Sequence, residues 1–139
     1  MEESKIISGL KFERYEVDEV SFNRNQKLPE GIDTWEIDFD VGAMVKTNEE
    51  KNKMKVNLQV VIFKKTKNPP FTMKVDIAGY FGTMEDIDIE KKYKANAIAI
   101  LYPYLRAIVS TYTASANISP IILPAINVNA MLEEQEKNK

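Results

Sequence analysis

Two pairs of aspartates are the side chains in this sequence best suited to chemistry, because one residue separates the members of each pair. Asp38 and Asp40 form one pair, and Asp86 and Asp88 form the other. Neighbouring carboxylates can hold Mg²⁺ or share acid–base work. However, the first pair alternates with apolar residues, as on the solvated side of a strand, and either member of the second pair could cap a helix. The structural interpretation is favoured, and a small Mg²⁺-dependent enzyme is kept as a minor alternative.

Other kinds of catalysis lack the residues that they need. The 139 residues include no Cys and no His. This excludes disulfides, thiolate nucleophiles, Cys/His metal sites and a Ser-His-Asp triad. The glycine patterns of nucleotide-binding loops and of the nucleophile elbow are also absent. The sequence therefore predicts no catalytic residues, no metal site and no cofactor, and hence a protein that is not an enzyme.

The charge balance argues against nucleic acid as a partner. The chain carries 19 basic and 21 acidic residues, for a net charge of −2, whereas nucleic-acid-binding domains are normally basic. The longest candidate membrane span, residues 95–112, contains Pro103 and Arg106 and suits lipid poorly. The acidic start of the sequence shows no signal peptide. We expect a cytoplasmic protein without direct membrane insertion, formed by a single domain over residues 1–139.

Alternation of apolar and polar residues with period two predicts four strands. Their expected ranges are Leu10–Phe22, Trp35–Ala43, Val56–Ile62 and Phe71–Ile77. The alternation in the first strand slips by one residue twice, which is typical of β-bulges. Short polar turns join the later strands, so consecutive strands should pair as antiparallel neighbours. Gly79 and Gly82 are interpreted as the close of the last strand.

After these glycines the apolar spacing changes to that of a helix, through Glu90–Ala116. Pro103 lies inside this segment and should kink the helix or divide it in two. An apolar linker follows, and Asn127 or Asn129 could cap a short last helix that carries Leu132. The expected fold class is therefore α+β, a four-stranded antiparallel β-meander packed against a long kinked helix and a short C-terminal helix.

Most of the long expected helix and the apolar part of the last one lie in one uncharged block, Ala95–Leu132, in which Arg106 is the only charged residue. Each large aliphatic side chain left in water costs roughly 1.5–3 kcal/mol. One sheet face cannot cover the long helix, which is apolar around most of its circumference, so we expect this helix to pack against a second copy of the chain. The residues predicted at this oligomer interface are Ile98, Leu101, Tyr104, Leu105, Ile108 and Tyr112.

The apolar side of the second strand has two interpretations. Trp35, Ile37 and Phe39 could belong to the core of the domain. Alternatively, they line a groove together with Leu28, Ile32 and the last helix, in which unfolded apolar segments bind. The residues alone leave both interpretations open.

Two segments of the block resemble the SecB family of export chaperones. They are residues 100–106, ILYPYLR, and residues 123–132, LPAINVNAML. The family has a corresponding Pro-Tyr-x-Arg helix and a Pro-containing linker into a helix of similar pattern. The resemblance implies a four-stranded antiparallel sheet with helices on one side, assembled as a homotetramer (a dimer of dimers) through the long helix. It also implies an ATP-independent holdase that binds non-native polypeptides for protein export and translocation.

By position, the resemblance also implies which residues bind clients. They are Leu28, Ile32, Trp35, Ile37, Phe39, Val128, Met131 and Leu132. The family contacts the translocase motor SecA through an acidic patch, of which Glu19 keeps one position. Asn23 replaces a second acidic position and Lys74 reverses the charge of a third, and such changes weaken an electrostatic contact. A SecB-like chaperone dedicated to an antitoxin is therefore the alternative to a partner of SecA that carries preproteins.

Overall fold

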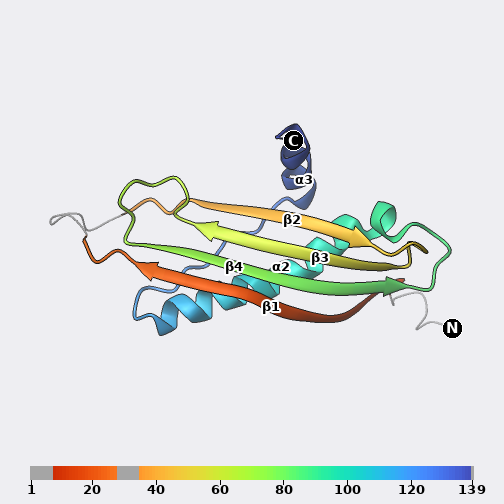
Figure 1. Cartoon of the computed structure of the whole chain (residues 1–139), viewed down its shortest axis with the longest axis horizontal. Coiled ribbons are helices and arrows are strands. Elements are labelled where there is room, and N and C mark those ends of the chain that lie inside the picture. Colours follow the sequence, from red (N-terminus) through yellow and green to blue (C-terminus); the bar gives the residue numbers. More distant parts are fainter. Residues whose placement is uncertain (1–7, 28–34, 139) are drawn as a thin grey trace.

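A computed structural model of the chain describes residues 8–27 and 35–138. Its elements, in chain order, are β1 (Leu10–Arg24), β2 (Phe39–Thr47), β3 (Lys53–Ile62), β4 (Phe71–Thr83), α2 (Ile89–Ser115) and α3 (Val128–Lys137). Figure 1 shows that α2 crosses one face of the sheet and that α3 stands at the β2 edge. The predicted α+β class, with four antiparallel strands, one long helix and one short helix, is confirmed.

The strand order is β1-β4-β3-β2, so the sheet is not a simple meander. Short turns join β2, β3 and β4, and these strands pair in sequence as predicted. β1 pairs with β4 instead, from Leu10 opposite Thr83 to Arg24 opposite Phe71. The meander was wrong for β1 because fourteen residues separate the end of β1 at Arg24 from the start of β2 at Phe39, enough for β2 to lie at the opposite edge of the sheet. Hairpin turns of about two to five residues are too short for this.

The two slips in the alternation of β1 are confirmed as irregularities of its pairing with β4. The register shifts between Phe12 and Arg14, and again between Val17 and Glu19. An extra residue at each shift restores apolar side chains to the inner face of the sheet. The slips in the sequence pattern were therefore a direct sign of two bulges.

Two strand boundaries differ from the prediction. β2 begins at Phe39 rather than at Trp35, because its partner β3 ends at Ile62. Phe63 has a left-handed backbone (φ 61°), and the carboxylate of Asp38 caps the turn that follows. β4 continues through Gly79, where α2 comes so close that an added Cβ would lie 2.9 Å from a methyl group of Leu101. Helix packing, not the end of a strand, accounts for this glycine.

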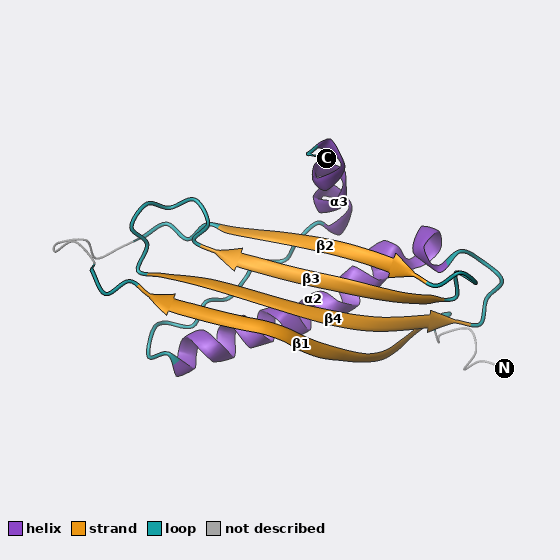
Figure 2. Cartoon of the chain, viewed as in Figure 1, coloured by secondary structure: helices purple, strands orange, loops and turns teal. Residues whose placement is uncertain are grey.

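The core lies between α2 and the inner face of the sheet (Figure 2). In β3 and β4 every second side chain points inward, as the alternation predicts, and is buried. The bulkiest fully buried residues are Phe81, Leu58, Ile62, Met73, Ile77, Ile89, Ile98, Leu101, Leu105 and Leu123. The long helix is thus the main cover of a single sheet face.

Both helices begin at side-chain caps, which settles the alternatives that the sequence left open. Asp88 caps α2, and its carboxylate accepts hydrogen bonds from the backbone N–H groups of Glu90 and Lys91. Asn127 caps α3 by accepting from the N–H of Ala130 (2.9 Å). α2 is not divided at Pro103, which lies inside one continuous helix of 27 residues.

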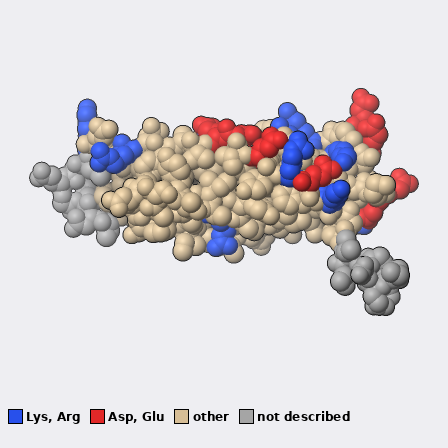
Figure 3. All heavy atoms as spheres, turned by 90° about the horizontal axis from the view of Figure 1, so that it is seen from below, with Lys and Arg blue, Asp and Glu red and all other residues tan. Residues whose placement is uncertain are grey.

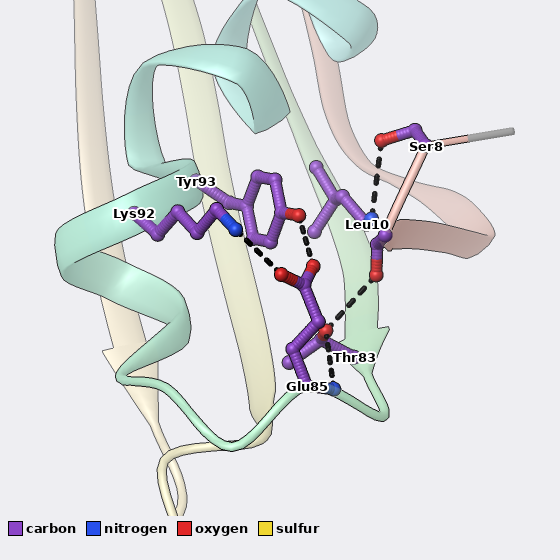
Figure 4. A network of polar contacts seen from close by, with 7 residues as sticks. Ser8, Leu10, Thr83, Glu85, Lys92 and Tyr93 are labelled. Carbon is purple, nitrogen blue, oxygen red and sulfur yellow. Dashed lines mark hydrogen bonds and ion pairs between the residues drawn. The ribbon is translucent and has the colours of Figure 1, made fainter. Parts of the chain in front are cut away.

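A polar network ties the start of β1 to the junction of β4 and α2 (Figure 4). The hydroxyl of Thr83 donates to the carbonyl of Gly9 (2.9 Å) and accepts from the N–H of Glu85 (3.1 Å). The Glu85 carboxylate then binds Lys92 and the hydroxyl of Tyr93 on the first turn of α2. The hydrogen bond from Lys92, followed by that from Tyr93, lowers the pKa of Glu85 below its ordinary value. This network orients α2 across the sheet.

Candidate functional site

Burial divides the uncharged block into parts with different roles, and the inner face of α2 belongs to the core. The buried residues of α2 are Ile89, Tyr93, Ala97, Ile98, Leu101, Tyr102, Leu105, Val109 and Thr113. Three of them, Ile98, Leu101 and Leu105, had been predicted at an oligomer interface but have 0% exposed surface. That part of the prediction is wrong, because these side chains pack on the sheet of their own chain and offer nothing to a second copy.

The other predicted interface residues lie on a neighbouring flank of α2. Tyr104 is 38% exposed, Tyr112 is 41% exposed and Ile108 is half-buried. The rings of Tyr104 and Tyr15 lie 4.5 Å apart, and both side chains line a hollow of about 320 Å³ with Ile108 and Tyr112. Figure 3, a view of the molecule from below Figure 1, shows charged side chains along the upper border and toward the right end of a broad area that is otherwise largely uncharged, with one basic group at its lower border.

The linker after α2 is pinned along that helix and thereby determines where α3 stands. The hydroxyl of Ser110 donates to the carbonyl of Ile121 (2.8 Å), and the N–H of Ile121 donates to the hydroxyl of Thr113 (2.9 Å). Farther along, the hydroxyl of Tyr102 donates to the carbonyl of Pro124. Burial raises the pKa of Tyr102, so this donor stays protonated across the physiological range. These contacts fix the path of the linker, which ends where α3 begins at the β2 edge (Figure 1).

α3 is apolar on one side, yet none of its ten residues is fully buried. Val128, Met131 and Leu132 are half-buried and touch the margin of the core. They are the three residues of this helix that the sequence predicted as client-binding. The structure brings them together on the side of α3 that faces the sheet, at the edge formed by β2 (Figure 1).

Between α3 and β2 lies a hollow of about 500 Å³, which we call the edge groove. It is lined by Asp38, Phe39, Asp40, Val41, Gly42, Lys64, Lys65, Met131, Glu134, Gln135 and Asn138. Phe39, Val41 and Met131 supply half-buried apolar surface, and charged residues surround them. An apolar strip with a charged rim can hold a short length of apolar chain while the rim stays hydrated.

The remaining predicted client-binding residues are placed less uniformly. Trp35 is half-buried against the core, and Ile37 is 47% exposed. Both precede β2 instead of lying within it, so neither is fixed by the strand ladder. Leu28 and Ile32 lie outside the described residues. Phe39 and Met131 are the two predicted residues that the structure places together in the edge groove.

Asp38 has a structural role at one end of the edge groove. Its carboxylate accepts hydrogen bonds from the backbone N–H groups of Lys64, Lys65 and Thr66, and from the Thr66 hydroxyl. The hydroxyl bond is the largest cause of a pKa below the ordinary value of Asp38, and the backbone bonds add to it against the opposing effect of desolvation. The ionised carboxylate of Asp38 therefore holds the turn that follows β3. The alternation in the sequence had suggested only a solvated surface side chain.

Gln135 is the residue of the edge groove that sequence reasoning missed. Its side-chain amide accepts a hydrogen bond from the N–H of Ala43 (2.8 Å) and donates one to the carbonyl of Ala43 (3.2 Å). In the sequence it stands in the charged tail EEQEKNK and looks like a solvated surface residue. A single uncharged Gln one helical turn after Met131 was the available signal.

Two of the other predicted aspartates also make local contacts. Asp40 pairs with Lys64 (2.9 Å), and Asp88, besides capping α2, lies 3.5 Å from Lys51. In the part of the chain that the structure describes, no group of three or more acidic residues is arranged to hold a metal ion. Nor does any described helix have the length and hydrophobicity to cross a membrane.

On the outer face of the sheet, Glu19 faces a basic neighbour. The ammonium group of Lys74 lies 3.3 Å from its carboxylate, with both side chains largely exposed. Asn23 lies farther along β1, opposite Thr72. Glu19, the acidic position that the sequence retains, is thus partly neutralised by Lys74, the basic residue at another position of the expected acidic patch.

A second and larger hollow, of about 760 Å³, lies at the start of β1. Its walls carry Lys11, Glu13, Lys53 and Glu85, and Lys53 pairs with Glu13 at 2.5 Å. The hydrogen bond from Lys53 lowers the pKa of Glu13. These ionised groups make the second hollow a poorer place for an apolar chain than the edge groove.

Comparisons of the sequence with known proteins connect this chain to one family. The family model described as preprotein translocase subunit SecB matches residues 7–139. An uncharacterized protein of Methanocaldococcus jannaschii is 35% identical over 137 residues, which cover 94% of this chain and 87% of that protein. The protein-export protein SecB of Anaplasma phagocytophilum is 30% identical over 87 residues, which cover 59% of this chain and 53% of that protein.

A comparison of structures agrees on the fold. The SecB-like chaperone Rv1957 of Mycobacterium tuberculosis, in complex with a ChAD peptide from the HigA1 antitoxin, superposes with a TM-score of 0.69. The alignment covers 88% of this chain and 95% of that chain, at 16% identity. The likeness at this identity concerns the fold, and it extends over nearly all of both chains.

Proposed function

The chain belongs to the SecB family, and from this membership we propose that it is an ATP-independent chaperone that holds unfolded polypeptides in the edge groove. One observation carries the proposal. Phe39 and Met131 lie together in a surface groove and are only half-buried. Half-exposed apolar surface is a liability unless a partner covers it. Family membership points to a binding protein rather than to an enzyme, and we place its action in the cytoplasm, where chains awaiting translocation are unfolded.

We further propose that the chain assembles as a tetramer, with the flank of Tyr104, Ile108 and Tyr112 at an interface. The exposure of these residues and the lack of charge around them support this assignment. Several grooves on one assembly would bind one long client at several points, so that weak contacts add up to useful avidity.

The assembly is tested by measuring molar mass with light scattering. Tyr112→Asp places a charge on the proposed interface and should lower the mass to that of a smaller species. Met84→Asp is the control, because Met84 is fully exposed in the turn before α2 and outside this flank. An unchanged mass in Tyr112→Asp would contradict the assigned interface.

Two client classes remain as candidates, preproteins for export and a dedicated antitoxin. Export requires delivery to SecA, and the Glu19–Lys74 pair and Asn23 favour the second candidate because they depart from an acidic contact surface. The antitoxin peptide bound to the M. tuberculosis chaperone shows that a protein of this fold can take such a client. A pull-down from the native cell separates the two candidates. A bound fraction dominated by one small protein contradicts general export, and a mixture of preproteins contradicts the dedicated role.

The holdase proposal is tested by suppression of aggregation of a chemically denatured client. Phe39→Asp and Met131→Asp place a charge in the edge groove and should each abolish suppression while the circular dichroism spectrum stays native. Ile122→Asp is the matched control, because Ile122 is 73% exposed on the linker and does not line the groove. Full activity in both groove variants would contradict the assignment.

A further inference from the structure

The β2 edge of the sheet carries backbone groups that no described strand pairs with. In the order β1-β4-β3-β2, β2 has β3 on one side and, among the described residues, no strand on the other. Edge strands of this kind offer N–H and C=O groups to any extended chain, and proteins usually cover them. Here the cover is α3, which stands at this edge (Figure 1).

The contact between Gln135 and Ala43 shows which backbone groups point outward. The N–H and C=O of Ala43 both bind the side-chain amide of Gln135 (2.8 and 3.2 Å), so both point away from β3. In an antiparallel ladder this orientation repeats at every second residue. The N–H and C=O groups of Phe39 and Val41 therefore also point away from β3, and both residues line the edge groove.

A glutamine side chain ends in the same pair of groups as a peptide bond, one carbonyl acceptor and an N–H donor. Bound to both backbone groups of Ala43, Gln135 makes the contacts that one residue of an adjoining strand would make. The contact covers one outward-pointing residue of β2, and the hollow of about 500 Å³ lies beside the two before it. Gln135 thus imitates one residue of an additional strand.

We propose that an extended segment of bound polypeptide adds to β2 as a fifth strand between Phe39 and Ala43, and that Gln135 occupies one of its backbone positions when no client is bound. This inference rests on the proposed chaperone function and names how the edge groove recognises its clients. Main-chain hydrogen bonds are common to all sequences, so recognition would be broad, and half-buried Phe39 and Met131 would favour apolar segments.

The construction of the edge favours an extended polypeptide over a second copy of this chain. A second copy that approached with its own β2 would bring its own α3, which lies across that strand with the same Gln135 contact. A single extended strand needs only the space between β2 and Met131 of α3. α3 can yield to it because none of its residues is fully buried.

The inference is tested with a fluorescent peptide of alternating Leu and Ser residues and two N-methylated versions of it. One version is methylated at the Leu residues and the other at the Ser residues, which removes the donors on one side of the strand at a time. Register slippage cannot rescue binding, because a shift by one residue turns every Leu to the other face. The full-length protein is titrated with each peptide by fluorescence anisotropy.

We expect one methylated peptide to bind at least about tenfold more weakly than its parent, since it loses hydrogen bonds worth about fivefold each, and the other to bind within about twofold. Equal binding of the two methylated peptides would overturn the added strand, while leaving an apolar groove and the chaperone function intact. No binding of the parent peptide, together with no suppression of aggregation, would overturn both.

Gln135→Ala tests whether the Gln135 side chain occupies a backbone position of the added strand. It removes the competitor for Ala43 and should tighten binding of the parent peptide by about threefold to tenfold. Glu133→Ala, on the same helix but outside the edge groove, is the control and should change binding less than about twofold. Weaker binding by Gln135→Ala would overturn the imitation. Self-association of this variant in sedimentation would overturn the choice of occupant, because a second copy would then fill the edge.

Discussion

The two helices share one largely uncharged stretch of sequence, Ala95–Leu132, but have opposite relations to the sheet. α2 crosses the inner face and buries nine residues, whereas α3 stands at the β2 edge and buries none. Apolar side chains that meet a sheet face become core, while those that meet a sheet edge stay half in water. Composition therefore predicts that the block as a whole is buried. The position of each helix relative to the sheet decides whether its apolar residues stabilise the fold or remain available for binding.

The largest effect is expected in the buried helix. Leu101→Ala leaves a cavity where α2 packs on β4 and should lower the free energy of unfolding by about 2–5 kcal/mol. Client binding per folded molecule should not change, because Leu101 has no exposed surface. Denaturant unfolding and a binding titration at low temperature measure the two quantities. Weakened client binding by the folded Leu101→Ala protein would contradict the assignment of stability to α2 and of binding to α3.

The same contact can be perturbed from the sheet. Gly79→Ala adds a methyl group 2.9 Å from Leu101, and overpacking of this kind should cost about 1–3 kcal/mol of unfolding free energy. Gly42→Ala is the matched control, since its added Cβ would lie 3.5 Å from the Gln135 side chain, an ordinary contact. Thermal unfolding measures both variants. A Gly79→Ala protein as stable as the control would contradict the close packing of α2 on β4.

Asp38 links the edge groove to stability. Asp38→Asn weakens the hydrogen bonds that hold residues 64–66 and should cost about 1–2 kcal/mol at neutral pH. The pKa of the folded carboxylate lies below the ordinary 3.8, so its stabilisation is complete above that pH and is lost as the pH falls through the lower, folded value. The difference in unfolding free energy between the two proteins should therefore narrow in acid. A constant difference down to pH 2 would contradict the role of the charge.

A smaller effect on stability is expected in the exposed helix. Met131→Ala removes half-buried surface from α3 and should change the free energy of unfolding by about 0.5–1 kcal/mol. Binding of an unfolded client should nevertheless weaken, the reverse of Leu101→Ala. The same two measurements apply. A stability loss as large as that of Leu101→Ala would show that α3 belongs to the core.

The outer face of the sheet should contribute least. Glu19 and Lys74 lie 3.3 Å apart with both side chains largely exposed, and such pairs contribute about 0.3 kcal/mol. A double-mutant cycle with Glu19→Gln and Lys74→Gln, measured by denaturant unfolding at low and high salt, should give a small coupling energy that salt removes. A coupling energy that survives high salt would contradict a screened surface pair.

Local patterns predicted much of the fold. Period-two alternation placed all four strands, its two slips marked the bulges of β1, and an aspartate and an asparagine marked the starts of α2 and α3. These features depend on residues close in sequence, which is why they could be predicted. The pairing of β1 with β4 could not, because a connection as long as residues 25–38 leaves the neighbour of a strand undetermined.

The candidate site was predicted only in its apolar part. Phe39 and Met131 have the residue types of a groove, and the structure brings them together. The periodicity of α2 could not tell which flank faces the sheet, so Leu101 and Leu105 were assigned to the interface although they are core. For Gln135 the only signal was an uncharged residue one helical turn after Met131, and its role could not be predicted because it depends on a contact with Ala43 far away in the sequence.

Amide hydrogen exchange of the full chain, with and without an unfolded client, tests the central claim most directly. If clients bind in the edge groove, exchange should slow at residues 39–45 of β2 and 128–135 of α3, and stay unchanged at the second hollow, around Leu10 and Thr83. Slowing at the second hollow with none at β2 and α3 would contradict the edge groove as the site of binding.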